Sequence, residues 1–133
     1  MDCIFCKIIN NEIPSLKVYE DEYTYVFMDI AKDVDGHILV IPKKHYKNIL
    51  DCDEVTLSHL IKTVKKVSNH CTEVCGYDGV NILNASDESA GQEVPHFHIH
   101  IILRKKDDMI NAWPHFTGAK KEIKDVFDTI KMN

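Results

Sequence analysis

Residues 95–102 read Pro-His-Phe-His-Ile-His-Ile-Ile, so imidazole alternates with large apolar side chains. Side chains two residues apart lie on the same face of a β-strand, about 6.6 Å from one another. The apolar residues would therefore face a core. One histidine could be an incidental polar residue of a half-exposed strand, but three in register favour a catalytic or metal-binding role. The histidines that would share one face are His96, His98 and His100.

The flanking sequence predicts an α+β domain in which an antiparallel sheet of about five strands surrounds one long helix. Apolar residues at a 3.6-residue spacing predict that helix over Glu54 to Cys75. Asp51 resembles the first residue of a capping box, and Gly76 suits the position after the helix. A second, C-terminal helix is predicted over 120–131. The strands are predicted at 17–20, 23–29, 37–41, 80–84 and 96–103.

Length and composition indicate one domain, because 133 residues with 44% hydrophobic and 28% charged residues suit a single core. The net charge of −5 disfavours a nucleic-acid partner. No apolar run reaches the roughly 18–20 residues of a membrane span, so we expect no membrane partner. Five cysteines, an odd number, without a basic and apolar leader predict reduced thiols and a cytoplasmic location.

The chemistry open to a group of histidines includes nucleophilic attack, proton transfer and metal binding. A histidine that attacks phosphorus forms a phosphoramidate, which water or a second substrate then resolves. Neighbouring imidazoles can bind phosphate oxygens and protonate the leaving group. The sequence lacks both common glycine-rich nucleotide loops, so phosphate chemistry here would use another device.

Cys3-Ile4-Phe5-Cys6 forms a CxxC motif, which is compatible with a redox pair, half of a zinc site or chance. A redox role calls for a motif that opens a helix after a strand in a βαβ unit, and the N-terminus does not predict one. A zinc site needs two further ligands.

The histidine run matches the signature His-x-His-x-His-x-x, with apolar residues at x, of the histidine-triad (HIT) nucleotide hydrolases and transferases. The chain resembles this family along nearly its whole length. It is most similar to the small adenosine phosphoramidase-like branch, and there to bacterial members with an N-terminal CxxC. The matching segments are 2–21, 28–30, 36–45, Asn84 and 91–100.

This resemblance implies a HIT-like fold and a homodimer in which each subunit binds a purine nucleotide. His98 would be the nucleophile at the α-phosphorus, His100 would contact the phosphate, and His37 would orient and polarise His98. Asp29 would hold the ribose hydroxyls; by itself it suggests only a turn, as does Asn84. The residues implied in nucleotide binding are Asp29, Ile30, Asn84, Gly91, Gln92, Glu93, His98 and His100.

The resemblance also implies a structural zinc ion, because CxxC members of the family add two histidines to the cysteines. The implied set is Cys3, Cys6, His45 and His96, the Cys₂His₂ composition of closed tetrahedral sites. Free thiols beside surface histidines are the alternative. The chain 1–133 is then one HIT domain: a zinc-tethered segment 1–14, a core 15–103 and a C-terminal extension 104–133.

The expected function is hydrolysis of purine nucleoside 5′-phosphoramidates or related nucleotidyl conjugates, through a covalent nucleotidyl-histidine and with no metal in the chemical step. Dinucleoside polyphosphate hydrolysis and nucleotidyl transfer are alternatives within the family. A non-catalytic nucleotide-binding adaptor is the alternative of a different class, although binding alone would not require the histidine nucleophile.

Overall fold

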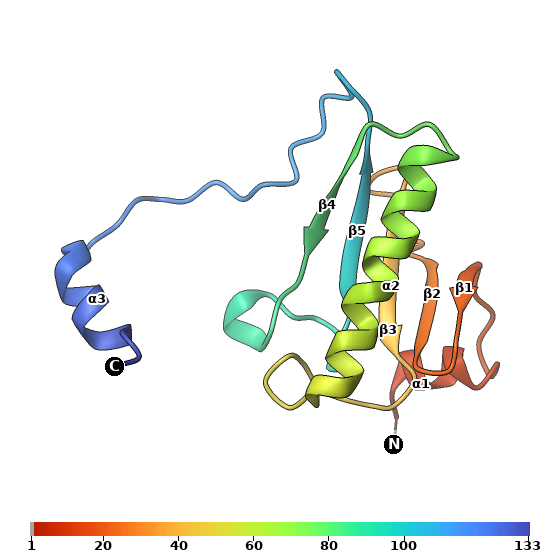
Figure 1. Ribbon diagram of the computed structural model, residues 1–133, viewed down its shortest axis with the longest axis horizontal. Helices are drawn as coiled ribbons and strands as arrows, with labels where there is room; N and C mark the ends of the chain where they lie inside the picture. Colours follow the sequence, from red (N-terminus) through yellow and green to blue (C-terminus); the bar gives the residue numbers. More distant parts are fainter. Residues whose placement is uncertain (1) are drawn as a thin grey trace.

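The computed structural model describes residues 2–133 and contains a five-stranded antiparallel sheet in the order β1-β2-β3-β5-β4 (Figure 1). The α+β class and the five strands predicted from the sequence are thus confirmed. The strands are β1 Lys17–Glu20, β2 Thr24–Met28, β3 His37–Pro42, β4 Gly79–Leu83 and β5 Ile99–Arg104. The helices are α1 Ile4–Ile9, α2 Glu54–Glu73 and α3 Ile123–Ile130, with a 3₁₀ turn η1 at Glu88–Ala90.

The long helix α2 covers one face of the sheet (Figure 1). Its buried stripe includes Leu60 and Val64, which belong to the same cluster as Ile99 and Ile101 of β5. Alternation along the strands brings these residues to one face, and each buried aliphatic side chain contributes about 1.5–3 kcal/mol. Phe97 joins the same core, so the apolar residues of the histidine run face a core as predicted, and the structure shows that this core includes residues of α2.

The opposite face is covered in part by α1, whose Phe5 and Ile8 pack in a second buried cluster with Leu39 of β3. In the register of β3 and β5, Leu39 lies opposite His100. The histidine is therefore on the α1 side of the sheet. Since α1 has only six residues, it leaves part of this face free for polar side chains.

Several element boundaries differ from the predicted ones. The cap of α2 is Asp53, which accepts a hydrogen bond from the Thr56 N–H at 2.7 Å. The capping box predicted at Asp51 is wrong, because that carboxylate binds two N–H groups of the preceding turn. The helix ends at Glu73, and Gly76 follows in the left-handed region with φ +84°.

The histidine strand begins three residues later than predicted, at Ile99. His96 and His98 lie in irregular backbone before β5. Pro95 cannot donate a ladder hydrogen bond, and the Phe97 N–H donates instead to the carbonyl of Tyr46 at 2.7 Å. The helix α1 was not predicted; it begins where the Cys3 sulfur accepts from the Cys6 N–H.

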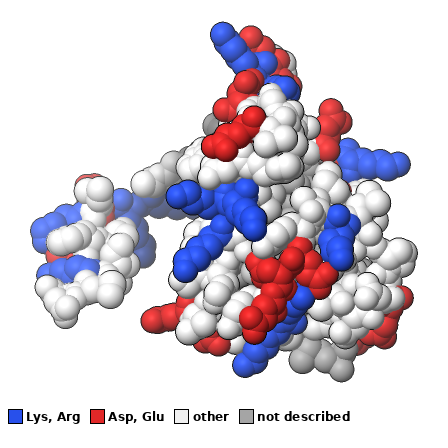
Figure 2. Space-filling view, turned by 45° about the vertical axis from the view of Figure 1, so that its right-hand side comes forward, with Lys and Arg blue, Asp and Glu red and all other residues white. Residues whose placement is uncertain are grey.

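The C-terminal extension leaves the sheet after β5 and carries α3 away from the body of the domain (Figure 1). The predicted C-terminal helix over 120–131 is confirmed but is shorter, and none of the residues of α3 is buried. Basic and acidic side chains are interspersed on the face shown in Figure 2. Within residues 2–133, no helix is both long and apolar enough to span a membrane.

Candidate functional site

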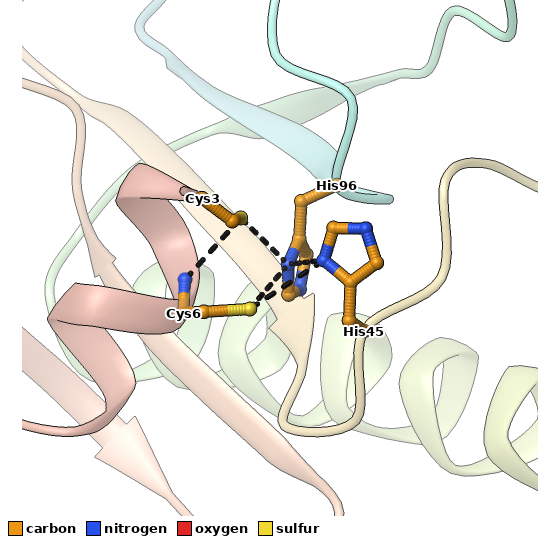
Figure 3. A group of neighbouring side chains, drawn as sticks. All are labelled: Cys3, Cys6, His45 and His96. Carbon is orange, nitrogen blue, oxygen red and sulfur yellow. Dashed lines mark hydrogen bonds between the residues drawn. The ribbon is translucent and has the colours of Figure 1, made fainter. Parts of the chain in front are cut away.

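Four potential metal ligands converge beside the start of α1 (Figure 3). Cys3 and Cys6 come from the N-terminal segment, His45 from the loop after β3 and His96 from the bend before β5. The sulfur of Cys3 lies 3.4 Å from Nδ1 of His96, and the sulfur of Cys6 lies 3.4 Å from Nδ1 of His45. Cys6 and His96 are 3.6 Å apart, and the two Nδ1 atoms 3.1 Å.

These distances fit the edges of a tetrahedron around zinc. Bond lengths of about 2.3 Å to sulfur and 2.0–2.1 Å to nitrogen imply edges of about 3.6 Å between S and N and 3.3 Å between two N atoms. Nε2 of His96 lies 2.9 Å from the Pro42 carbonyl, which can only accept a hydrogen bond. Nε2 therefore carries the proton, and the Nδ1 lone pair points into the cluster, as a metal ligand requires.

The electrostatics of this cluster suit a divalent cation. Burial lowers the pKa of His96 to about 4, against the opposing hydrogen bond to Pro42, so the ring is neutral at pH 7. Burial, with a smaller contribution from Cys3, raises the pKa of the Cys6 thiol to about 11. A bound cation would favour the thiolates that this apolar setting otherwise disfavours. The residues present thus fit a structural zinc ion.

A second group of titratable residues occupies the free part of the α1 face. His37 at the start of β3 and His100 of β5 form a hydrogen bond of 2.8 Å between Nε2 and Nδ1. The other nitrogen of His37 lies 3.0 and 3.1 Å from the carboxylate oxygens of Asp33. Because the carboxylate accepts, His37 Nδ1 is the donor. A neutral His37 then accepts from His100 through Nε2, which leaves Nε2 of His100 as an acceptor.

The environment keeps His100 uncharged at neutral pH. Burial first, and then the neighbouring His98 and His37, lower the pKa of His100 to about 4. The hydrogen bond from His37 lowers the pKa of Asp33, so its carboxylate stays ionised. Sequence reasoning missed Asp33; a carboxylate four residues before a functional histidine was the only available signal.

His98 stands next to this pair with a fixed tautomer. Its Nδ1 lies 2.7 Å from the backbone carbonyl of His96, so Nδ1 donates and Nε2 keeps its lone pair. The ring centroids of His98 and His100 are 4.9 Å apart, and Phe5 packs edge-on against His98 at 5.3 Å. Asn84 donates to the His98 carbonyl at 2.8 Å. The structure thus brings the three candidate catalytic histidines together.

Two cavities adjoin these histidines. The first, of about 270 Å³, has mostly apolar walls that include Phe5 and Leu39, with Asp29 as its one carboxylate and Ile30 beside it. We call it the Asp29 cavity. The second, of about 350 Å³, is lined by His37 and His100 together with a set of aliphatic residues; we call it the His100 cavity. Asp29 of the first cavity lies 3.7 Å from Nε2 of His37 of the second.

Of the residues predicted to bind phosphate, Asn84 lines the His100 cavity. The loop that carries the others lies elsewhere. Gly91, Gln92 and Glu93 line neither of the two cavities among the residues that the structure describes. The N–H groups of Gly91 and Gln92 donate to carbonyls of their own loop, at 3.0 and 3.2 Å. Their role in phosphate binding stays a prediction, and it would require this loop to rearrange.

The backbone of this loop is strained. Asp87 has φ 73° and ψ 163°, a conformation that side-chain-bearing residues rarely adopt. The Gln92 amide oxygen accepts from the Asp87 N–H at 2.8 Å, and its amide nitrogen donates to the Lys47 carbonyl at 2.6 Å. These side-chain bonds hold the loop in its present form.

Comparison with known proteins places the chain in a family. The HIT domain model matches residues 10–107. A HIT-like protein of Borreliella burgdorferi is 48% identical, over 80% of this chain and 78% of its own length. The adenosine 5′-monophosphoramidase of Schizosaccharomyces pombe is 35% identical, over 93% of this chain and 92% of its own length. The structure of a Zn-bound histidine triad protein from Mycobacterium smegmatis superposes with a TM-score of 0.79 at 31% identity. The match covers 84% of this chain and 81% of that protein. The chain therefore belongs to the HIT family.

Proposed function

We propose that this protein hydrolyses purine nucleoside 5′-phosphoramidates or related nucleotidyl conjugates through a covalent nucleotidyl intermediate on His98. The observation that carries the proposal is the tautomer of His98: its Nδ1 is bound to the His96 carbonyl, so Nε2 is free to attack phosphorus. The phosphoramidase activity of the S. pombe relative supports the choice of reaction.

The Asp29 cavity is the proposed nucleoside site. Its apolar walls, which include Phe5, Phe27 and Leu39, suit a purine ring. A carboxylate can accept hydrogen bonds from both hydroxyls of a ribose, and Asp29 is the carboxylate of this cavity. The phosphate would then lie next to the histidines, because Asp29 is 3.7 Å from Nε2 of His37.

The reaction has two steps. Nε2 of His98 attacks the α-phosphorus, a P–N bond to the histidine forms, and the bond to the leaving group breaks. The leaving amine departs with the bonding electrons and takes up a proton. Water then attacks phosphorus and loses a proton, the P–Nε2 bond breaks, and the nucleoside monophosphate is released. With a proton on both nitrogens of His37, its Nε2 would donate to Nδ1 of His100, and the Nε2–H of His100 would donate to a phosphate oxygen in both steps.

The cluster of Cys3, Cys6, His45 and His96 is the proposed zinc site, and its role is structural because four protein ligands leave no open position. Zinc there would join α1 to the segment that carries His98. The Zn-bound relative from M. smegmatis supports this proposal.

We further propose a homodimer. β4 is an edge strand, and a groove beside it has apolar walls that include Ile49, Ile61 and Ile82. A second copy of the chain would cover this surface. Light scattering should give the mass of two chains for the wild type and of one for Ile82→Lys (44% exposed). The matched control is Val18→Lys on the other edge strand (41% exposed), which should stay dimeric. A monomeric wild type would refute the dimer.

The catalytic proposal is tested by mixing the protein with adenosine 5′-phosphoramidate, quenching rapidly in base and locating the adduct by peptide mass spectrometry. We expect an adenylyl group on His98 and its absence, together with turnover, in His98→Ala. His115→Ala, in an exposed loop, is the matched control and should retain both. Turnover by His98→Ala at the wild-type rate would refute the mechanism, and nucleotide binding without turnover by the wild type would favour an adaptor.

A further inference from the structure

Three side chains outside the cysteine–histidine cluster also converge with potential metal-ligand atoms. They are Asp29, His37 and His100, whose donor atoms all lie within 4.8 Å of one another. Oδ2 of Asp29 lies 3.7 Å from Nε2 of His37, and the same Nε2 lies 2.8 Å from Nδ1 of His100. Two imidazoles and one carboxylate form a set of ligands that suits divalent transition metals.

Hydrogen bonding does not account for the approach of Asp29 to His37. Oδ1 of Asp29 accepts from the Ala31 N–H at 2.8 Å, whereas Oδ2 accepts no hydrogen bond from residues 2–133. At 3.7 Å, Oδ2 is too far from Nε2 of His37 to form one. In neutral His37 this nitrogen carries a lone pair, because Nδ1 donates to Asp33. A negative oxygen thus lies beside an electron-rich nitrogen, and a cation between them would stabilise both.

The distances in this group are close to those around a metal ion. Bonds of about 2.0–2.2 Å from a metal to nitrogen and carboxylate oxygen imply distances of about 3.0–3.5 Å between neighbouring ligand atoms. The observed 2.8 and 3.7 Å differ from this range by a few tenths of an ångström, which small side-chain rotations would correct. His100 would bind the metal through Nδ1 as the tautomer that carries its proton on Nε2.

The scaffold holds all three side chains in position. His37 and His100 lie on the paired strands β3 and β5. The Asp29 N–H donates to the His37 carbonyl at 2.8 Å, which ties the third side chain to the same strand. Nδ1 of His37 donates to Asp33, and a carboxylate in this position orients a metal-binding imidazole. The ligands are therefore preorganised for a metal ion.

This group differs from the cysteine–histidine cluster in its ligands and in its access. Its side chains line the Asp29 cavity and the His100 cavity, so a metal bound by three protein ligands would keep a position for water. Two imidazoles favour zinc, cobalt or nickel over magnesium. Because it offers three ligands and no thiolate, the group should bind zinc more weakly than the cluster does.

We propose that Asp29, His37 and His100 form a second metal site, which takes zinc or a similar divalent transition metal and excludes the nucleotide while it is occupied. The exclusion rests on the function proposed above, in which Asp29 holds the ribose and a proton lies between His37 and His100. A metal ion would replace that proton and occupy two side chains that the substrate needs. Zinc beyond the structural ion would therefore inhibit the reaction by competition with the substrate.

Zinc binding tests the site without reference to activity. Protein whose cysteine–histidine cluster already holds zinc is brought to equilibrium by dialysis at several Zn²⁺ concentrations, and the bound zinc is measured by elemental analysis. We expect about one further zinc ion per chain, with an affinity reduced about tenfold or more in Asp29→Asn and in Asp33→Asn. Asp35→Asn, at an exposed carboxylate of the same loop, is the matched control and should bind zinc as the wild type does.

Cobalt identifies the ligands of the further ion. Co²⁺ added to the zinc-containing protein should give the visible absorption of a nitrogen and oxygen site, without the sulfur-to-cobalt charge-transfer band that Cys3 and Cys6 would produce. Thermal unfolding checks that each variant folds. The site is refuted if the wild type binds no further metal, if Asp29→Asn binds it with wild-type affinity, or if the charge-transfer band appears instead.

Competition with the nucleotide is measured separately. Added zinc should raise the KM for adenosine 5′-phosphoramidate severalfold and leave kcat unchanged, and AMP should displace the further zinc ion from the wild type. If the ion binds as expected but AMP does not displace it, the exclusion is wrong. Failure of the wild type to form the adenylyl adduct on His98 without added zinc would instead refute the proposed function, and it would not change the zinc content on which the metal site depends.

Discussion

The backbone carbonyl of His96 accepts a hydrogen bond from Nδ1 of His98 at 2.7 Å, while the side chain of His96 points into the cysteine–histidine cluster. One residue thus connects the candidate metal site to the candidate nucleophile. Movement of His96 would disturb the orientation and the tautomer of His98, although the two side chains serve different sites.

The first prediction concerns metal removal. The purified protein should contain about one zinc ion per chain, and Cys6→Ser should lose it. Because His96 would then be less firmly held, kcat should fall about 10- to 100-fold through misorientation of His98. Elemental analysis and steady-state kinetics measure both effects. Cys75→Ser, at an exposed cysteine outside the cluster, should change neither; an undiminished zinc content in Cys6→Ser would refute the ligand assignment.

The second prediction concerns Asp33, whose carboxylate holds His37 at 3.0 Å. Asp33→Asn preserves the shape of the side chain but removes its charge, so it should lower kcat by about tenfold or more and change the pH profile of kcat/KM. Asp35→Asn, an exposed carboxylate two residues away, is the matched control. Equal pH profiles for the wild type and Asp33→Asn would show that the carboxylate does not act through His37.

The third prediction concerns acid stability. Burial lowers the pKa of His100 to about 4 in the folded protein, below the roughly 6.5 of an unfolded histidine. The unfolded chain therefore binds more protons between these values, and the free energy of unfolding falls as pH drops from about 6.5 to 4. We expect His100 to account for about 1–2 kcal/mol of this loss, after allowing for the solvent contact of the ring.

Urea unfolding at several pH values would measure this dependence. The free energy of unfolding of His100→Gln should decrease less than that of the wild type over the same range. Above about pH 6.5, His100 should contribute no pH dependence to the stability of the wild type. His115→Gln, at an exposed histidine, should match the wild type. If the free energies of unfolding of His100→Gln and the wild type fell in parallel with pH, His100 would not be a source of the acid sensitivity.

The fourth prediction concerns Gly36, which precedes His37. A Cβ there would lie 2.7 Å from Cβ of Leu103 and 2.8 Å from its Cδ1, closer than carbon atoms approach. Gly36→Ala should therefore cost about 1–3 kcal/mol of stability and lower activity by shifting His37. Gly79→Ala is the matched control, because a Cβ there meets no atom within 4 Å. Equal unfolding midpoints for the two variants would count against this packing argument.

Local periodicity in the sequence was enough to predict the sheet faces and the long helix. Phe97, Ile99 and Ile101 do face a core, because alternation along an extended chain is a property of the backbone itself. The four metal-ligand candidates also converge as the family resemblance implied. The start of β5 was predicted too early, because the hydrogen bond of Phe97 goes to a residue distant in sequence, Tyr46.

The tertiary structure alone decided the features that depend on contacts between distant or irregular segments. No periodic pattern marks Asp33 as the partner of His37, and none places Asp29 within 3.7 Å of Nε2 of His37. The sequence by itself determined which residue types could perform the chemistry and which face of the sheet would carry them. Only folding decided their distances, tautomers and cavities, because these follow from side chains that the chain brings together across loops.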